Sequence, residues 1–198
     1  QRSIIYLIDI MKTRCKWLDL TKEEYIKYHD KDWGVQEHND RKLFAKLILD
    51  GAQAGLSWYT ILRKRDNYRK AFDNWDYKKI AKYDSNKELE LLKNEGIVRN
   101  KLKIKSAIKN AQTFIKIREE FGSFDNYLWG FVNYKQIINK FKSVDEIPSK
   151  TELSDKISKD LKKRGMNFVG STIIYAFMQA VGMVNDHQVD CFRYKEVQ

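Results

Sequence analysis

Apolar residues recur at helical spacing along most of the chain. Between Asp40, which can cap a helix, and Asp50, where the apolar pattern stops, four large side chains share one helical face. They are Leu43, Phe44, Leu47 and Ile48. The spacing predicts a helix whose apolar face packs on the core, followed by a turn with Asp50 at its edge.

Three more helices follow from the same pattern. A long amphipathic helix is predicted beyond residue 100, with apolar positions at Leu102, Ile104, Ile108, Ala111, Phe114 and Ile115. Ser154 can start another helix that ends at Gly165. The segment from Thr172 to Ala180 is apolar nearly all round, which is typical of a central buried helix.

Two capping-box patterns mark further helix starts. Thr21 with Glu24 is expected to begin a helix whose Tyr25, Tyr28 and His29 point the same way. Ser143 with Glu146 gives the second box, shortly before the single proline.

Composition favours an all-α fold. One proline and nine glycines in 198 residues leave little room for loops, and we find no repeat or low-complexity linker. The only candidate strand is the aromatic-rich segment from Phe124 to Val132. We expect a single domain over residues 11–198, preceded by an N-terminal extension over residues 1–10 that need not be native, since Met11 suits a natural start.

Charge and cysteine content narrow the function classes. Lys and Arg number 38 against 27 Asp and Glu, a net charge of +11, so the surface should attract polyanions, nucleic acid first. The alternative is a generally basic surface without a specific partner. No apolar run is long enough to span a membrane, and no signal peptide is apparent. Two cysteines do not suggest a disulfide framework, so we expect a cytoplasmic protein.

A basic turn between two predicted helices is the first candidate site. It begins with Lys162, Lys163 and Arg164, and ends at the start of the next helix. Its other candidate DNA-binding residues are Gly165, Phe168, Gly170, Ser171 and Thr172. Glycines let the backbone approach a partner closely, and the free N–H groups of a helix start suit a DNA phosphate. Any tight interhelical turn could show the same pattern.

Both cysteines and two of the three histidines form the second candidate site. Cys15, His29, His187 and Cys191 offer the nitrogen and sulfur ligands that zinc prefers in a tetrahedron. Four protein ligands leave no open position, so such a zinc ion would be structural and would join the N- and C-terminal segments. The alternative is that these are unrelated core residues, since cysteine is often a small buried hydrophobe.

Aromatic residues around Asp50 form the third candidate site. Trp17, Tyr25, Tyr28, Trp33 and Trp58 accompany this carboxylate. Stacking and cation–π contacts with a carboxylate nearby suit an extruded, positively charged purine. Composition alone equally allows these rings to fill the core.

Several separated motifs, in order, resemble the bacterial 3-methyladenine DNA glycosylase I family of the helix-hairpin-helix superfamily. The matching segments are Arg14-Cys15-x-Trp17, Tyr28-His29-Asp30-x-x-Trp33-Gly34-Val35, Gly51-x-Gln53-Ala54-Gly55-Leu56-Ser57-Trp58, Lys163-Arg164-Gly165 with Phe168-Val169-Gly170, and Asn185-Asp186-His187. The resemblance runs from about Met11 to Cys191. It implies an all-α helix-hairpin-helix glycosylase, with the hairpin near residues 154–182.

The resemblance also implies roles for the candidate residues. Cys15, His29, His187 and Cys191 look like the ligands of a structural zinc ion. Tyr25 and Trp58 look like stacking walls around the base, and Tyr28 like a hydrogen-bond partner of its edge. Leu56 is the candidate wedge that fills the gap left by the extruded base. The expected partners are double-stranded alkylated DNA and 3-methyladenine, and the expected state is a monomer.

One position departs from the family pattern. The family has Glu just before the Gly-x-Gln-Ala-Gly segment, whereas this chain has Asp50, whose side chain is shorter by about 1.5 Å. Asp50 is the candidate catalytic residue, because it would pair with the edge of the cationic base. The alternative function is a zinc-stapled module that binds damaged DNA with little or no catalysis, because Asp50 has impaired the pocket. Asp186 is expected to support the zinc site or the hairpin.

Overall fold

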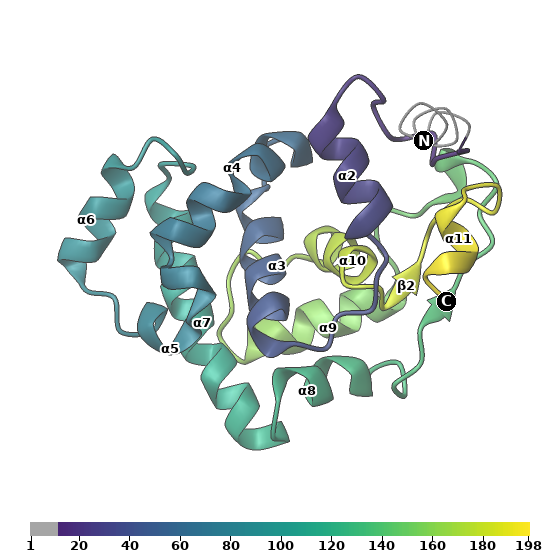
Figure 1. Ribbon diagram of the computed structural model, residues 1–198. Coiled ribbons are helices and arrows are strands. Elements are labelled where there is room, and N and C mark those ends of the chain that lie inside the picture. The colour runs from purple at the N-terminus through teal and green to yellow at the C-terminus, as the bar shows by residue number, and fades with distance from the viewer. Residues whose placement is uncertain (1–11) are drawn as a thin grey trace.

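Helices dominate residues 12–198, the part of the chain that a computed structural model describes (Figure 1). The first half contains α2 (Glu23–Lys31), α3 (Asp40–Ala52), α4 (Trp58–Ala71), the short 3₁₀ helix η1 (Asp73–Trp75), α5 (Tyr77–Ile80) and α6 (Ser85–Lys93). The second half contains α7 (Lys101–Phe121), α8 (Phe124–Gly130), β1 (Ile137–Ile138), the 3₁₀ helix η2 (Val144–Glu146), α9 (Glu152–Lys163), α10 (Ser171–Ala180), β2 (Val184–Asn185) and α11 (Arg193–Glu196). None of these described helices has the length and apolar character needed to cross a membrane. The extension expected over residues 1–10 lies outside the described residues.

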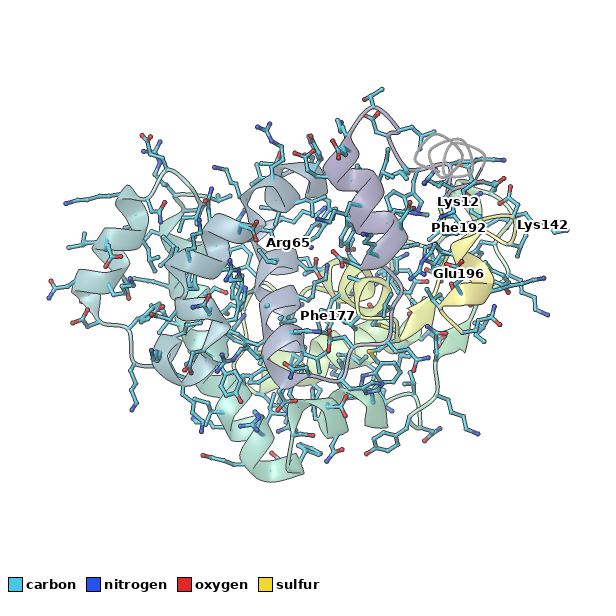
Figure 2. The ribbon with its side chains drawn as sticks, in the orientation of Figure 1. Lys12, Arg65, Lys142, Phe177, Phe192 and Glu196 are labelled. Carbon is cyan, nitrogen blue, oxygen red and sulfur yellow. The ribbon has the colours of Figure 1, made fainter. Side chains whose placement is uncertain are left out.

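Helix α10 occupies the centre of the molecule, as its apolar sequence predicts. It packs against α9 and α3, and α3 packs in turn against α7. Phe177 of α10 is fully buried and is labelled beside α3 in Figure 2. The four apolar residues predicted to share one face of α3 are all buried, which confirms that stripe.

Two short strands correct the expectation that the chain has none. β1 and β2 pair in parallel, with Ile137 opposite Val184 and Ile138 opposite Asn185. The aromatic-rich segment that sequence left open as a strand is mostly helical instead, because it forms α8. The strand pair joins segments that are distant in sequence, which local periodicity does not reveal.

Several predicted helix starts shift by one to three residues. At α2 the N-cap is Lys22 without a side-chain cap, because the Thr21 hydroxyl donates to Asp19 instead. Asn39, and not Asp40, caps α3. The Asp40 carboxylate accepts hydrogen bonds from the backbone N–H groups at the start of α8 and pairs with Arg118. It is therefore not available to cap its own helix.

Four other features of the helices differ from the sequence-based predictions. Helix α3 continues through Asp50 to Ala52. The box predicted at Ser143 is absent, and that residue precedes only η2 without a side-chain cap. Helix α9 starts from Thr151, with Ser154 as the reciprocal member of its capping box. Leu102 is 69% exposed, although the predicted stripe of α7 included it.

Candidate active site and metal centre

The aromatic residues around Asp50 enclose one cavity. Its volume of about 330 Å³ lies within the range of small-molecule sites, roughly 300–1,000 Å³. Helix α2 brings Tyr25 and Tyr28, α3 brings Asp50, and α4 begins with Trp58. The cavity is also lined by Trp17, Trp33, Gln53, Val144, Ile147, Ala176 and Gln179. All four residues predicted to bind or act on the base therefore share a single hollow.

Asp50 supplies a carboxylate to this cavity from the last turn of α3. Burial raises the pKa of Asp50 to about 6, and the positive charge of Lys46 opposes that rise. One carboxylate oxygen, Oδ2, is buried without a hydrogen-bond partner among the described residues. An unpaired buried polar group costs about 1–3 kcal/mol, so a ligand that pairs with it recovers binding free energy.

Unpaired donors accompany this acceptor. The indole N–H groups of Trp17 and Trp58 are buried, and neither meets an acceptor within residues 12–198. The Trp17 ring contacts the Tyr25 ring at 5.4 Å, and the Trp58 ring contacts the Tyr28 ring at 5.2 Å between centroids. The cavity thus combines aromatic walls with polar groups that have spare hydrogen-bonding capacity, an arrangement suited to a flat heterocycle.

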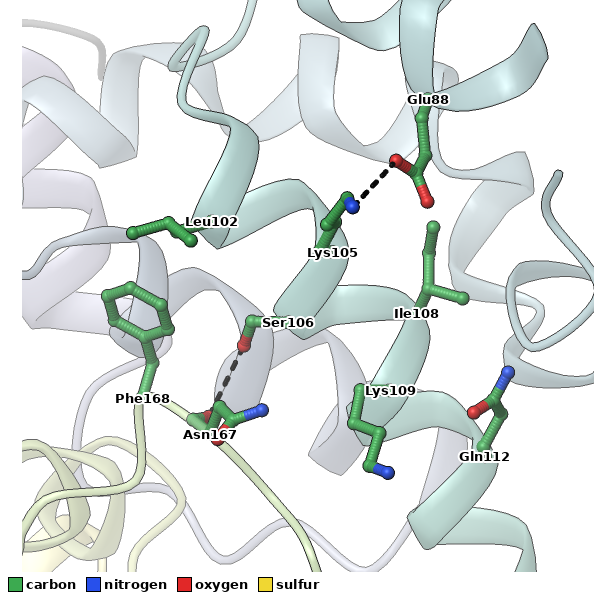
Figure 3. A pocket seen from close by; sticks show the side chains of 9 residues that line it. All are labelled: Glu88, Leu102, Lys105, Ser106, Ile108, Lys109, Gln112, Asn167 and Phe168. Carbon is green, nitrogen blue, oxygen red and sulfur yellow. Dashed lines mark hydrogen bonds and ion pairs between the residues drawn. The ribbon is translucent and has the colours of Figure 1, made fainter. Parts of the chain in front are cut away.

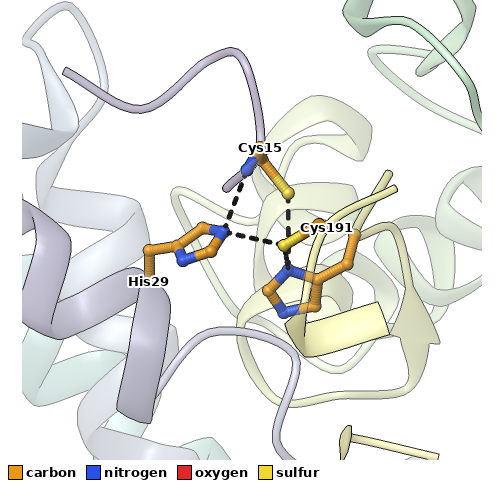
Figure 4. A group of neighbouring side chains, drawn as sticks. Cys15, His29 and Cys191 are labelled. Atoms are coloured by element: carbon orange, nitrogen blue, oxygen red, sulfur yellow. Dashed lines mark hydrogen bonds between the residues drawn. The ribbon is translucent and has the colours of Figure 1, made fainter. Parts of the chain in front are cut away.

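The four predicted metal ligands also meet. Cys15, His29, His187 and Cys191 are all buried, and their ligand atoms lie within 4.8 Å of one another (Figure 4). Cys15 Sγ is 3.4 Å from His187 Nδ1, and Cys191 Sγ is 3.5 Å from both His187 Nδ1 and His29 Nε2. Tetrahedral zinc with bonds of about 2.3 Å to sulfur and 2.0–2.1 Å to nitrogen requires separations of about 3.5 Å. The cluster fits that ion.

Neighbouring acceptors select the histidine tautomers that such a site needs. The Asp30 carboxylate accepts a hydrogen bond from His29 Nδ1 at 2.7 Å, which leaves the Nε2 lone pair for a metal. The carbonyl oxygen of Trp33 accepts from His187 Nε2 at 3.1 Å, which leaves Nδ1. Each free nitrogen is the one that faces a cysteine sulfur.

Comparison with known proteins decides the family. A family model described as methyladenine glycosylase matches residues 17–194. The chain belongs to the methyladenine glycosylase family. It is 45% identical over 181 residues to DNA-3-methyladenine glycosylase of Haemophilus influenzae, covering 91% of this chain and 97% of that protein. It is 44% identical to DNA-3-methyladenine glycosylase 1 of Escherichia coli, covering 91% and 96%.

Solved structures of the family share the fold. A crystal structure of 3-methyladenine DNA glycosylase I matches with a TM-score of 0.88 and 46% identity, covering 91% of this chain and 98% of that one. A structure of the Staphylococcus aureus glycosylase, concerned with 3-methyladenine recognition, matches with a TM-score of 0.88 and 31% identity, covering 90% and 95%. Another structure, at 30% identity and the same TM-score, contains bound 3-methyladenine and covers 90% and 96%.

In this family member, the basic turn predicted to bind DNA joins α9 to α10. Lys162 and Lys163 are exposed at the end of α9. Arg164 instead pairs with Asp160 and Glu120, both at 2.6 Å. The two lysines therefore remain available for a phosphate, whereas the Arg164 charge is already balanced.

The rest of the turn is built for a tight connection. Gly165 has a φ of +105° and Phe168 a φ of +54°, both in the region that favours glycine. Gly170 is the N-cap of α10, and no side chain caps this helix start. Thr172 is exposed, whereas the Ser171 hydroxyl is hydrogen-bonded to a serine of α9 at 2.8 Å.

The turn is anchored on α7. Ser106 and Asn110 of α7 donate to the carbonyl oxygen of Asn167 at 3.3 and 2.8 Å. A groove of about 730 Å³ lies between α6, α7 and the turn, with Phe168 at one end (Figure 3).

Leu56, the predicted wedge, is 40% exposed in the loop after α3. Lys103 of α7 donates to the carbonyl oxygens of Ala52 and Ala54 at 2.8 and 2.6 Å. Helix α7 therefore supports both the α9–α10 turn and the loop that carries Leu56.

Asp186 contacts α10, within the predicted hairpin, which is one of the two roles expected for it. Its carboxylate accepts hydrogen bonds from Asn139, Tyr175 and Gln179 at 2.7, 2.7 and 2.8 Å. It thereby ties α10 to the residues that directly follow β1 and β2. Asp30 is the carboxylate that orients a metal-site histidine.

Five site residues were missed from sequence. Val144, Ile147, Ala176 and Gln179 complete the cavity from η2, its flank and α10, and no local pattern marks them. Lys46 contacts the Tyr28 and Trp58 rings that form walls of the cavity. Its position four residues before Asp50, on the same helical side, was the available signal.

Proposed function

We propose that this protein removes 3-methyladenine from alkylated double-stranded DNA by hydrolysing the bond between base and sugar, leaving an abasic site. Family membership over nearly the whole chain supports the reaction. The aromatic cavity with its buried carboxylate carries the assignment of the site, because it suits a cationic purine swung out of the duplex.

Base recognition combines stacking with charge. Tyr25 and Trp58 stack on the extruded base, and the Tyr28 hydroxyl and Asp50 carboxylate pair with its edge. Asp50 is ionised in most molecules at neutral pH, since its pKa of about 6 lies below 7. A carboxylate in a buried site attracts a cation more strongly than it would in water.

Bond cleavage needs little further chemistry from the protein. A purine that already carries positive charge leaves the sugar readily, so the cavity contributes mainly shape and electrostatic stabilisation. Water attacks the sugar from the DNA side. The bond breaks as the base takes both bonding electrons, which neutralises its charge, and the water loses a proton to solvent.

DNA binding falls to the helical hairpin, with Leu56 as the wedge in the duplex. Lys162 and Lys163 contribute the sequence-independent attraction to phosphates. The turn residues Gly165, Phe168 and Gly170 let the backbone approach DNA, and Ser171 and Thr172 begin the helix whose N–H groups face the phosphate. Arg164 stabilises the turn through its two ion pairs.

A structural zinc ion held by Cys15, His29, His187 and Cys191 completes the proposal. The ligand separations and the two fixed tautomers support it. Bound there, the ion would join the segment before α2 to the segment after β2, at a distance from the chemistry.

Release of free 3-methyladenine from alkylated duplex DNA tests the proposal. The protein should release the base, and Asp50→Glu should retain or increase the rate, because the longer side chain reaches further into the cavity. Lack of release from both proteins, with DNA binding intact, would favour a damage-binding module. The full-length match to named glycosylases does not favour that alternative.

A further inference from the structure

Lys46 is a half-buried lysine that the proposed reaction does not yet use. It lies on α3, one helical turn before Asp50. Its ammonium nitrogen donates a hydrogen bond to the Tyr28 hydroxyl oxygen at 2.9 Å. The same nitrogen lies 4.3 Å from the centroid of the Trp58 ring and 4.7 Å from that of the Tyr28 ring. One cation thus touches two walls of the base cavity.

Lys46 reaches these walls from outside the cavity. It lines a second recess, of about 490 Å³, which shares Tyr28 with the base cavity. Lys46 is not among the residues that line the base cavity itself. Its contacts with the site therefore run through Tyr28 and Trp58, and through its charge near Asp50.

The surrounding charges leave Asp50 as the main electrostatic partner of Lys46. Among neighbouring charges, Asp50 affects the Lys46 pKa most and raises it, while burial lowers that pKa. Arg65 of α4 (Figure 2) and Asp32, which follows α2, also act on it, but these two pair with each other at 2.7 Å. The other charged groups of the recess are Lys31, Glu37, Lys42, Asp66 and Arg69. Helix α10, which also lines the base cavity, contains no charged residue.

The hydrogen bond from Lys46 leaves the Tyr28 hydroxyl as a hydrogen-bond donor to the base. A tyrosine hydroxyl has one hydrogen, and Lys46 occupies an acceptor site of the oxygen. Within residues 12–198 this hydroxyl forms no other hydrogen bond, so its hydrogen is free to be donated. The base edge is the acceptor that this geometry serves.

We propose that Lys46 is a positioning residue for base removal, which orients the Tyr28 hydroxyl and supplies the counter-charge that keeps Asp50 ionised. The inference rests on the proposed function. Because the Lys46 cation repels a cationic base, Lys46 does not act by tightening base binding. The benefit of its charge appears at acidic pH, where Asp50 would otherwise take up a proton, and the benefit of its hydrogen bond to Tyr28 appears at neutral pH as well.

The test is the pH profile of single-turnover base release by the full chain. Release should fall on the acidic side as Asp50 becomes protonated. Lys46→Met keeps an unbranched side chain on the rings but removes the charge, so it should shift this acidic limb upward by about one pH unit. Lys46→Arg should retain the profile. If Lys46→Met does not fold, Lys46→Gln replaces it.

Lys42→Met is the matched control. Lys42 lies one turn earlier on α3 and lines the same recess, but it pairs with Glu37 at 3.2 Å and is 72% exposed. Lys42→Met should leave the acidic limb of the pH profile of base release unshifted. In a Tyr28→Phe background, Lys46→Met should slow release less than in the wild type at neutral pH, since its orienting partner is gone.

Three results would overturn the inference. An unshifted limb in Lys46→Met would remove the charge role, and an equal shift in Lys42→Met would make the effect non-specific. An undiminished effect of Lys46→Met in the Tyr28→Phe background would remove the orienting role. Absence of base release by the wild type would instead refute the proposed function, and this inference with it.

Discussion

Replacing Asp50 by asparagine should make the protein more stable and its reaction slower. The folded-state pKa of Asp50, about 6, lies above its ordinary value of 3.8 because the carboxylate is buried. The folded state therefore holds the proton more tightly than the unfolded state does. Above about pH 6 the ionised group destabilises the fold, and a difference of about two pKa units corresponds to about 3 kcal/mol.

Asparagine has nearly the same shape and carries no charge, so it removes this penalty. Its amide still needs hydrogen-bond partners, which reduces the gain to about 1–2 kcal/mol. Near pH 8 we expect the free energy of unfolding to rise by that amount. The advantage of Asp50→Asn should shrink as the pH falls below about 6 and nearly vanish by about pH 4, where the wild-type carboxyl is protonated.

The same substitution removes the carboxylate that is proposed to pair with the cationic base. A hydrogen bond to a charged group contributes about 1.5–3 kcal/mol, which corresponds to release slower by about 10-fold to 150-fold. Urea unfolding at several pH values measures the stability, and single-turnover base release measures the activity. A less stable Asp50→Asn protein near pH 8, or unchanged release, would refute the role given to this buried charge.

Three further substitutions test other parts of the molecule. Cys191→Ser should reduce bound zinc from about one ion per chain and lower the unfolding temperature; equal zinc in both proteins would contradict the metal site. Lys162→Gln combined with Lys163→Gln should weaken DNA binding and reduce the slope of log affinity against log salt by about 0.9 for each phosphate that is no longer neutralised, and an unchanged slope would remove these lysines from the interface. Gly182→Ala should destabilise the fold by more than about 2 kcal/mol, because its Cβ would lie 2.6 Å from backbone atoms of Val35 and Gln36 at a φ of +72°. An unaltered unfolding midpoint would contradict that clash.

Helix identity was predictable because apolar periodicity is local. The buried face of α3 and the apolar α10 follow directly from residue spacing. Helix starts were less predictable, since adjacent polar residues compete for the cap. Asn39 caps α3 because Asp40 is recruited by Arg118 and α8, more than 75 residues away in sequence. Leu102 is exposed because α7 begins at the molecular surface.

In the candidate sites too, residue types were predictable from sequence, whereas the contacts between distant residues were not. Residue type alone could indicate the metal ligands, because the chain has few cysteines and histidines. Their convergence depends on contacts such as that between Cys15 and His187, 172 residues apart. Sequence left two roles open for Asp186, support of the zinc site or of the hairpin, and its hydrogen bond with Tyr175 of α10 agrees with the second. The contribution of Ile147 to the base cavity depends on tertiary packing, which no local pattern encodes.

The most direct test of the proposed recognition site is a crystal structure of this protein with 3-methyladenine. We predict that the base stacks between Tyr25 and Trp58, with its edge hydrogen-bonded to Asp50 Oδ2. Binding of the base outside this cavity, or stacking with Asp50 directed away from it, would contradict the account.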